Sequence, residues 1–396
     1  MLRPRSLLSR FKLLPEEPGN PGSHIYRPNF WRQSIEKEMK NVMPAFKFVD
    51  DDKIPPGYQK MACHCIFDVK ITLTRKCRLV AQGNTVEPSG DPTFASVVSR
   101  ESVRIAFLTA ALNDLNILSA DVQNAYINAP VGNDKIYIIA GKEFGAALEG
   151  RPAIIVRALY GLWGSGARWR DHMASTLRDA GYASCKADPD VWMRADTKSD
   201  GFQYWSYVLV YSDDLLVVHH NPQSVMDFLA SRYTLKEGSV KEPDLYLGAQ
   251  VKKWYIPGSD DPGKVRWALS SEDYVKQAVE DVESELRNTD RCLPTRTTTP
   301  LSQGYRPELD ASDECDATRG NYYQSLIGVL RWICELGRVD IMVAVSMLSR
   351  YVVSPRVGHL EQVFHVFAYL KHHKRSTMVF DDTEPQFDES RFQVCN

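Results

Sequence analysis

Hydrophobic and polar positions change their spacing along the chain, and each spacing predicts a different kind of element. Trp31, Ile35, Met39 and Val42 recur at helical spacing and predict an amphipathic helix. Residues 60–80 instead alternate between apolar and polar, as the two faces of a strand do. The N-terminal part is therefore expected to combine a helix with a hairpin.

The middle of the chain mixes helical and strand-like spacing. Residues 102–115 predict a buried helix, and residues 117–122 predict an apolar strand with Asp121 near its end. Further predicted elements are a helix that ends at Gly181, strands at 191–193 and 204–219, and a helix after Pro222.

Beyond about residue 265 the spacing is helical. A stretch rich in Pro and Thr, residues 293–307, interrupts it. This change predicts a boundary between a mixed domain and a helical one. The candidate helices are 271–286, 322–336, 340–351 and 359–372.

Composition places the chain among folded proteins. Its 43% of hydrophobic and 25% of charged residues are ordinary for a soluble domain, and 396 residues suggest two or three packed units. The net charge of -2 does not decide for or against nucleic acid, because a local basic stripe is what counts. Eight cysteines without regular spacing predict reduced thiols. With neither a membrane-spanning run nor a secretion signal, we expect an intracellular protein that is not secreted, in the cytoplasm or the nucleus.

A basic stretch lies within the predicted hairpin. Arg75, Lys76 and Arg78 fall in a segment, residues 69–80, that has no acidic residue. These side chains either meet phosphate groups or keep a solvated strand edge from aggregating, and the sequence leaves both interpretations open.

The strongest chemical signal is a pair of adjacent carboxylates, Asp213 and Asp214, inside a run apolar enough to be buried. Burying such a pair costs several kcal/mol unless a cation compensates, although Ser-Asp-Asp is also ordinary turn chemistry. Asp121 favours the first interpretation, because two strands that each deliver an aspartate could place the acids side by side. Oxygen ligands of this kind suit two Mg²⁺ ions, with Mn²⁺ as the alternative.

These residues resemble the motifs of reverse transcriptases. Tyr-Ser-Asp-Asp at 211–214 resembles the Tyr-x-Asp-Asp box, and residues 121–126 are similar to the first catalytic motif, Asp-x-x-x-Ala-Phe/Tyr. An ordered set of further segments resembles retrotransposons of the copia type over roughly residues 30–375. These segments are 77–83, 94–97, 159–162, 246–248, 325–328, 339–341, 348–351 and 369–371.

The resemblance implies an α+β right-hand polymerase with fingers, a palm built on an antiparallel sheet, and a helical thumb. The expected divisions are a tail or linker remnant (1–27), fingers and palm (28–264), a thumb-like region (265–380) and a truncated tail (381–396) before an absent ribonuclease H domain. The implied partners are an RNA or DNA template with its primer, dNTPs, and proteins of a retroelement particle. A membrane partner is not expected, and the oligomeric state is not predicted.

The resemblance also implies roles for single residues. Asp121 and Asp213 would bridge two metal ions while Asp214 supports them, and Tyr126 would exclude a 2′-hydroxyl unless it is simply a core aromatic. The other implied nucleotide contacts are Arg75, Lys76, Arg78, Tyr160, Gly161 and Tyr211, and the implied primer-positioning residues are Tyr246, Leu247 and Gly248.

The chain departs from the family pattern after Leu162. The family reads Lys-Gln-Ala/Ser-Pro-Arg there, whereas this chain has residues 163–167 as Trp-Gly-Ser-Gly-Ala, with Arg168 one place late. The chain also ends at Asn396, before the acidic stretch that would open a ribonuclease H domain, and no protease or integrase precedes it. The alternative to an active polymerase is therefore a decayed retroelement fragment or a nucleic-acid-binding module. Tyr126 argues against a palm that makes RNA.

Overall fold

The computed structural model describes residues 28–50, 53–69, 74–254, 266–295 and 297–382. The predicted tails, 1–27 and all but two residues of 381–396, lie outside the described residues. Contacts divide the described chain into two compact units, and the chain passes from one unit to the other after Ala106, Asp114 and Glu242. The first unit comprises residues 28–106 and 115–242, and the second comprises residues 107–114 and 243–382.

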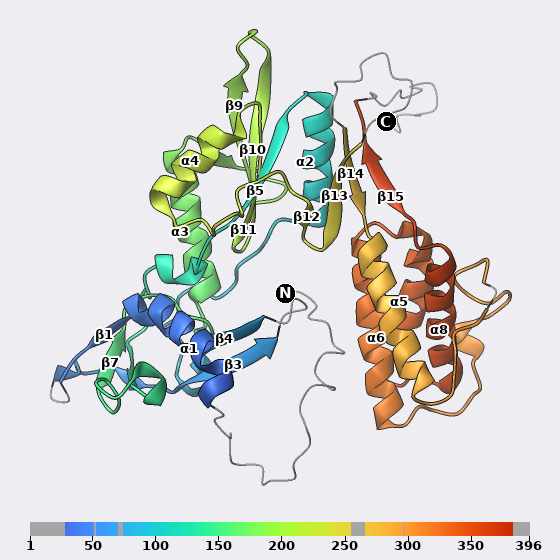
Figure 1. Cartoon of the computed structure of the whole chain (residues 1–396), viewed down its shortest axis with the longest axis horizontal. Coiled ribbons are helices and arrows are strands. Elements are labelled where there is room, and N and C mark those ends of the chain that lie inside the picture. The colour runs from blue at the N-terminus through green and yellow to red at the C-terminus, as the bar shows by residue number, and fades with distance from the viewer. Residues whose placement is uncertain (1–27, 51–52, 70–73, 255–265, 296, 383–396) are drawn as a thin grey trace, which may run out of the picture. The chain divides into compact units, whose positions relative to one another are not determined.

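A five-stranded antiparallel sheet, in the order β5-β11-β10-β9-β8, forms one layer of the first unit (Figure 1). Helices α3 and α4 pack on this sheet through Trp169, Met173, Leu177, Val225 and Leu229. Gly181 has φ +82°, as expected of the residue that follows a helix end. The elements are β5 (Asn116–Asp121), α3 (Ser165–Asp179), β8 (Ala183–Ser184), β9 (Val191–Thr197), β10 (Gln203–Tyr211), β11 (Asp214–His219) and α4 (Pro222–Arg232).

A second layer of the first unit combines a four-stranded sheet, β1-β7-β6-β2, with the hairpin β3-β4. Helix α1 (Pro28–Val42) packs on β4 because Ile35 and Met39 join Cys77 and Leu79 in one hydrophobic cluster. The strands are β1 (Phe46–Phe48), β2 (Gln59–Lys60), β3 (Cys63–Val69), β4 (Arg75–Ala81), β6 (Ile136–Ile139) and β7 (Pro152–Ile155), and short 3-10 helices occur at Met43–Ala45, Gly83–Thr85, Ala125–Asn128 (η5) and Lys142–Phe144.

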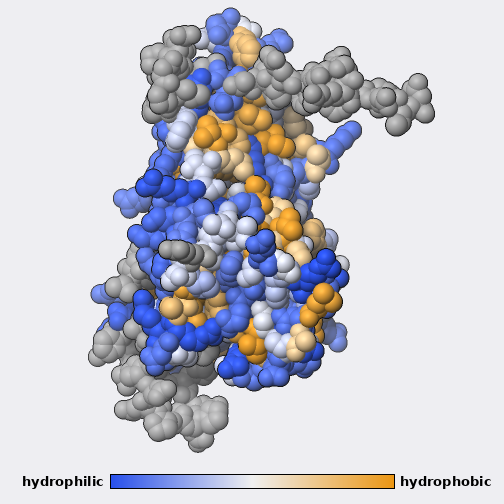
Figure 2. All heavy atoms as spheres, turned by 90° about the vertical axis from the view of Figure 1, so that its right-hand side faces the viewer, coloured by the Kyte–Doolittle hydropathy of each residue, from blue (hydrophilic) through white to orange (hydrophobic). Residues whose placement is uncertain are grey.

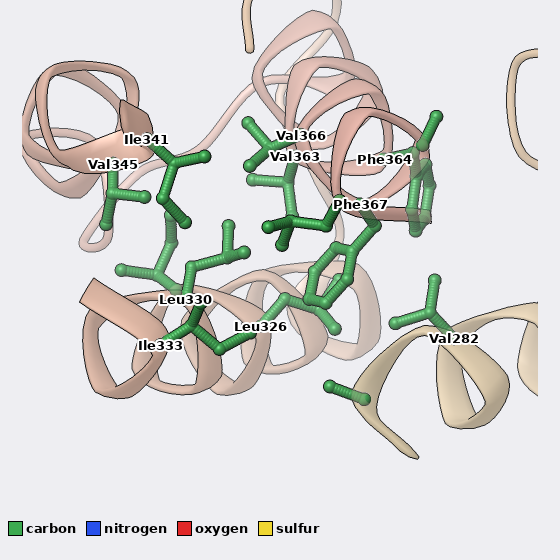
Figure 3. Packing of buried hydrophobic residues seen from close by; sticks show 14 of the residues in the cluster. Val282, Leu326, Leu330, Ile333, Ile341, Val345, Val363, Phe364, Val366 and Phe367 are labelled. Carbon is green, nitrogen blue, oxygen red and sulfur yellow. The ribbon is translucent and has the colours of Figure 1, made fainter. Parts of the chain in front are cut away.

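The second unit joins a four-stranded sheet, β12-β13-β14-β15, to a helical bundle. Figure 3 shows Leu326, Leu330 and Ile333 facing Val363 and Phe367 across the bundle core. Helix α2 supplies residues to both units. The elements are α2 (Arg100–Leu112), β12 (Leu245–Tyr246), β13 (Ala249–Trp254), β14 (Arg266–Ser270), α5 (Glu272–Arg287), α6 (Ala317–Glu335), α7 (Met342–Ser349), α8 (Val357–His372) and β15 (Thr377–Phe380), with 3-10 helices at Pro307–Leu309 and Val339–Ile341.

The described helices and strands confirm the predicted α+β class and every predicted element within a few residues. The prediction that only helices follow residue 265 was wrong, because β14 and β15 add strands there. All five residues of β14 are buried, so no polar position alternates in its sequence to reveal a strand. No helix in the described ranges is long and apolar enough to cross a membrane. The surface in Figure 2 is mostly hydrophilic, with separate apolar patches.

A polar network is buried at the end of β10 and β11 that lies away from Asp214. The His219 Nε2 atom is 3.5 Å from the Asp196 carboxylate, which also accepts hydrogen bonds from Arg194 and Ser206. Burial lowers the pKa of His219, while Asp196 opposes that shift, and His220 and Arg194 add to it. His219 is thus held neutral inside the sheet.

We expect this neutral histidine to make the fold sensitive to mild acid. Its pKa is about 6.5 in the unfolded chain and lower in the folded one, so its contribution is complete above pH 6.5 and is lost as the pH falls. The free energy of unfolding in urea should therefore decrease between pH 7.5 and 5.5, and less steeply in His219→Gln. The exposed residue His372 provides the control, and equal slopes for His219→Gln and His372→Gln would contradict the assignment.

Candidate active site

The turn between β10 and β11 carries the predicted carboxylate pair. Tyr211 pairs with Asp214 across the hairpin, so Ser212 and Asp213 form a two-residue turn. Ser212 has φ +58°, a conformation that costs a residue with a Cβ energy. The Trp169 indole Nε1 donates a 2.9 Å hydrogen bond to the Ser212 carbonyl oxygen, so helix α3 holds the turn in place.

Strand β5 brings Asp121 to this turn. Asp121 pairs directly with Asp214 in the antiparallel ladder, and the Val122 amide donates a 2.8 Å hydrogen bond to the Asp213 carbonyl oxygen. Directly paired residues have Cα atoms about 4.5–5.5 Å apart. The backbone thus places the three predicted acids at neighbouring ends of β5 and β11, where the two strands pair.

Two residues that follow α4, Lys236 and Ser239, lie beside Asp121. The Lys236 amide donates to the Asp121 carbonyl oxygen at 2.9 Å, and the Ser239 hydroxyl accepts from the Asp121 amide at 3.1 Å. The Lys236 ammonium lies 3.3 Å from the Asp121 carboxylate, whose side chain is 30% exposed. A positive charge therefore already occupies the position beside this carboxylate.

The chemistry of these residues fits divalent cations. Like charges directly opposite each other in a ladder repel, so Asp121 and Asp214 favour a cation between them. The Lys236 ammonium supplies part of this positive charge beside Asp121. Over the residues that the structure describes, no three His, Cys, Asp or Glu side chains are grouped as a metal site. The backbone thus brings the acids together, while one carboxylate oxygen of Asp121 is directed to Lys236.

Two tyrosines and an arginine lie beside the turn. The Tyr126 ring, on η5, is 4.8 Å from the Tyr160 ring, and the Arg78 guanidinium lies 5.7 Å from the centre of the Tyr160 ring. Burial raises the pKa of Tyr126, whose hydroxyl is hydrogen bonded to the Ser212 side chain. Burial also raises the pKa of Tyr160 to about 12, with the Asp213 charge adding to the effect. The phenols therefore stay neutral and face an acidic turn.

The predicted basic residues of β4 do not act as one group, because successive side chains of a strand point to opposite faces. The Arg75 guanidinium lies over the Trp31 ring at 5.9 Å, whereas Arg78 faces Tyr160. Lys76 and Arg78 are both close enough to Glu38 to lower its pKa, although burial raises that pKa more. The Arg78 Nε atom is buried and makes no hydrogen bond to any described residue.

The altered loop after Leu162 is well packed. The backbone of Tyr160 and Gly161 touches the end of β4, where the Ala81 amide donates a 2.7 Å hydrogen bond to the Tyr160 carbonyl oxygen. Gly161 has φ +92°, and a Cβ there would lie 2.0 Å from the Ala81 carbonyl oxygen, so only glycine fits. The Trp163 indole donates a 2.6 Å hydrogen bond to the Gly83 carbonyl oxygen while its side chain stays half exposed.

The predicted primer-positioning residues belong to the second unit. Tyr246 and Ala249 pair across the β12-β13 hairpin, so Leu247 and Gly248 form its two-residue turn. Both have positive φ, +48° and +88°, which is the signature of a type I′ turn. Leucine is unusual in that conformation, and its role there stays a prediction.

Sequence reasoning missed the two residues that hold the site from outside the motifs. Lys236 belongs to no recognisable pattern, and only the chain path beside β5 places it next to Asp121. Trp169 lies on the buried face of α3, and its hydrogen bond to Ser212 leaves no signal in the spacing of apolar residues.

Comparisons with known proteins agree on one family. The family model described as reverse transcriptase (RNA-dependent DNA polymerase) matches residues 46–295. The putative transposon Ty5-1 protein of Saccharomyces cerevisiae is 30% identical over 258 residues, which cover 63% of this chain and 74% of that protein. The retrovirus-related Pol polyprotein from transposon TNT 1-94 of Nicotiana tabacum is 23% identical over 373 residues, which cover 89% of this chain and 26% of the polyprotein.

A solved structure is also similar. A foamy viral protease–reverse transcriptase in complex with double-stranded DNA matches with a TM-score of 0.44 and 11% identity, over 85% of this chain and 48% of that one. The chain thus spans about a quarter of the tobacco polyprotein and about half of the foamy viral chain. The extent of the family match, together with the relatives' names, shows that the chain belongs to the reverse transcriptase family of copia-type retrotransposon Pol polyproteins.

Proposed function

We propose that the chain is an RNA-directed DNA polymerase that adds dNTPs to the 3′-hydroxyl of a primer on an RNA or DNA template. The observation that carries the proposal is the direct pairing of Asp121 with Asp214, next to Asp213 on the turn. The family membership supports the same reaction. We assign residues 28–264 to the fingers and palm and residues 265–380 to the thumb, although the second compact unit already begins at Pro243.

Asp121, Asp213 and Asp214 would hold two Mg²⁺ or Mn²⁺ ions through oxygen ligands. When bound, such ions would supply charge that favours attack by the primer hydroxyl and departure of pyrophosphate. The protein holds the acids in register through the β5-β11 ladder and the Trp169 hydrogen bond to the turn. The Lys236 ammonium balances part of the negative charge of the Asp121 carboxylate.

The nucleotide would lie between the acidic turn and the Arg78–Tyr160–Tyr126 cluster. Arg78 would pair with a phosphate, since its guanidinium carries a buried nitrogen that no described residue satisfies. Tyr126 would lie under the sugar, fixed by Tyr160 on one side and by Ser212 on the other. Selection of deoxynucleotides would follow from a clash of its ring with a 2′-hydroxyl.

Primer extension on an RNA template tests the proposal. The purified chain should extend a labelled DNA primer when Mg²⁺ and dNTPs are present, and EDTA should stop the reaction. A chain that binds the template and primer tightly but does not extend in Mg²⁺ or Mn²⁺ would instead be a binding module. The altered loop at 163–168 is the departure from the family pattern that favours this second outcome, and it is held to the Gly83 carbonyl oxygen by the Trp163 indole.

Tyr126→Val should admit ribonucleotides. Removing the ring opens space at the sugar, so the ratio of kcat/KM for dNTP over rNTP should fall by about a hundredfold. Single-nucleotide incorporation with matched dNTP and rNTP measures this ratio. Tyr126→Phe is the control, because it keeps the ring and loses only the hydroxyl that contacts Ser212. Unchanged sugar selection in Tyr126→Val would show that another residue is the gate.

A further inference from the structure

A polar pocket of about 320 Å³ opens in the first unit, next to the strand that carries Asp121. None of the residues that line it is acidic. Its polar lining consists of carboxamide, hydroxyl and guanidinium groups, from Asn41, Gln123, Asn124, Asn128, Arg157 and Thr234. A concave site with a few convergent polar groups is the usual form of a small-ligand site, and this volume lies at the lower end of the common range.

Two residues that line the pocket lie close along the chain to the candidate active site. Gln123 follows Asp121 by two residues, and its backbone N–H donates a 2.9 Å hydrogen bond to the Thr234 carbonyl oxygen. Thr234 precedes Lys236 by two residues, and the Lys236 ammonium contacts Asp121. Two backbone segments therefore line the pocket and continue directly to the catalytic carboxylate.

The charge in the pocket is positive. Arg157 is exposed. Among the described residues its guanidinium makes one hydrogen bond, a long one of 3.4 Å to the Asn128 carbonyl oxygen, and no ion pair. A guanidinium has five N–H donors, so most of its capacity is available to a ligand. The Asn128 amide nitrogen is shared among three carbonyl oxygens of η5 and the residues before it, at 3.2 to 3.5 Å, which fixes this wall.

We propose that this pocket binds a small polyphosphate anion. Two ligands of this chemistry are expected if the proposed function holds, on which the inference rests. They are the pyrophosphate released by nucleotidyl transfer and the triphosphate of a second nucleotide. Both present clustered oxygen acceptors, which suit a guanidinium fork and amide donors. Anionic ligands also suit a pocket without a carboxylate, whereas a cation would meet Arg157.

Calorimetric titration of the whole chain in EDTA tests the pocket separately from catalysis. Without metal ions the three aspartates repel an anion, and binding at Arg78 would not depend on Arg157, so saturable binding of pyrophosphate that Arg157→Gln weakens reports the pocket. Arg157→Gln should weaken this binding at least tenfold, because a charge-assisted pair is lost. Arg151→Gln removes an exposed arginine outside the pocket and should leave the affinity for pyrophosphate unchanged. Asp121→Asn removes a nearby negative charge, so it should leave that affinity unchanged or strengthen it.

Parallel titrations distinguish the sources. Binding of pyrophosphate but not of dATP would assign a product site, and binding of both with similar affinity would assign a triphosphate site. Equal affinities of wild type and Arg157→Gln, no saturable binding, or displacement of pyrophosphate by a single-stranded oligonucleotide without a terminal phosphate would overturn the proposal. The primer-extension assay tests the proposed polymerase independently of the pocket. A chain that binds pyrophosphate in EDTA but never extends a primer would refute only the proposed polymerase activity.

Discussion

Asp213→Asn is expected to reduce Mg²⁺-dependent primer extension by about a thousandfold or more while the chain stays folded. The change replaces a charged oxygen ligand with a neutral amide of the same size, so the proposed metal ions would lose a shared ligand. The rate of single-nucleotide incorporation under saturating dNTP is the measurement. Circular dichroism and thermal unfolding of the same sample would report the fold.

The contacts of Asp213 explain why the fold should survive. Asp213 is hydrogen bonded to the residue after β5 through its backbone carbonyl oxygen, which accepts from the Val122 amide. The substitution leaves this backbone bond unchanged. Asparagine is also common in turns, so the two-residue loop should form. Relief of repulsion from Asp121 and Asp214 could even raise the melting temperature of the metal-free chain.

Asp227→Asn is the matched control, because Asp227 is an exposed acid on α4 away from the β5-β11 ladder. It should retain wild-type extension. Normal activity in Asp213→Asn, or the same loss in both variants, would remove Asp213 from the proposed chemistry. Asp121→Asn should behave like Asp213→Asn, with the added release of Lys236 from its carboxylate.

The sequence predicted the elements that bear the candidate site because their signals are local. Short apolar runs predict β5, β10 and β11, and a short polar interruption between β10 and β11 marks a turn. The Asp121–Asp214 pairing also follows from two apolar strands that each end in an acid, once they are neighbours in the sheet. Spacing and motif order were therefore sufficient for this part of the site.

The rest depends on long-range contacts that leave no local signal. Lys236 approaches Asp121 from 115 positions away, and no periodic pattern marks it. The basic residues of β4 formed one group in the sequence, but strand alternation separates Arg75 from Arg78. The pocket at Arg157 also escaped prediction, since its walls come from four separate stretches of the first unit.

The altered loop illustrates how a departure from a motif can be explained by packing. Arg168, one place later than the family arginine, is 10% exposed and pairs with Asp91 at 2.9 Å and with Asp134 at 2.8 Å. The guanidinium also fills the space beside Gly132 and Gly164, where a Cβ would lie within 3 Å of it. Arg168 therefore ties the start of α3 to two distant loops.

Arg168→Met is expected to destabilise the chain by about 3 kcal/mol, because removing one partner of a buried pair leaves the other charge uncompensated. Asp134, whose side chain is only 7% exposed, would bear most of this cost. The free energy of unfolding in urea, compared with that of wild type at pH 7, measures it. Arg178→Met on the same helix is the control, since Arg178 is exposed and should lose far less.

The pH dependence and a second substitution separate an ion pair from simple loss of packing. The hydrogen bond from Arg168 holds the pKa of Asp91 far below its usual range, so the pair stabilises the fold above about pH 4 and less as the pH falls further. The difference between wild type and Arg168→Met should shrink accordingly in acid. Adding Asp134→Asn to Arg168→Met should recover part of the loss, because the stranded charge is gone. Strictly additive effects of the two substitutions, together with a difference that is the same at every pH, would mean that Arg168 contributes only its volume.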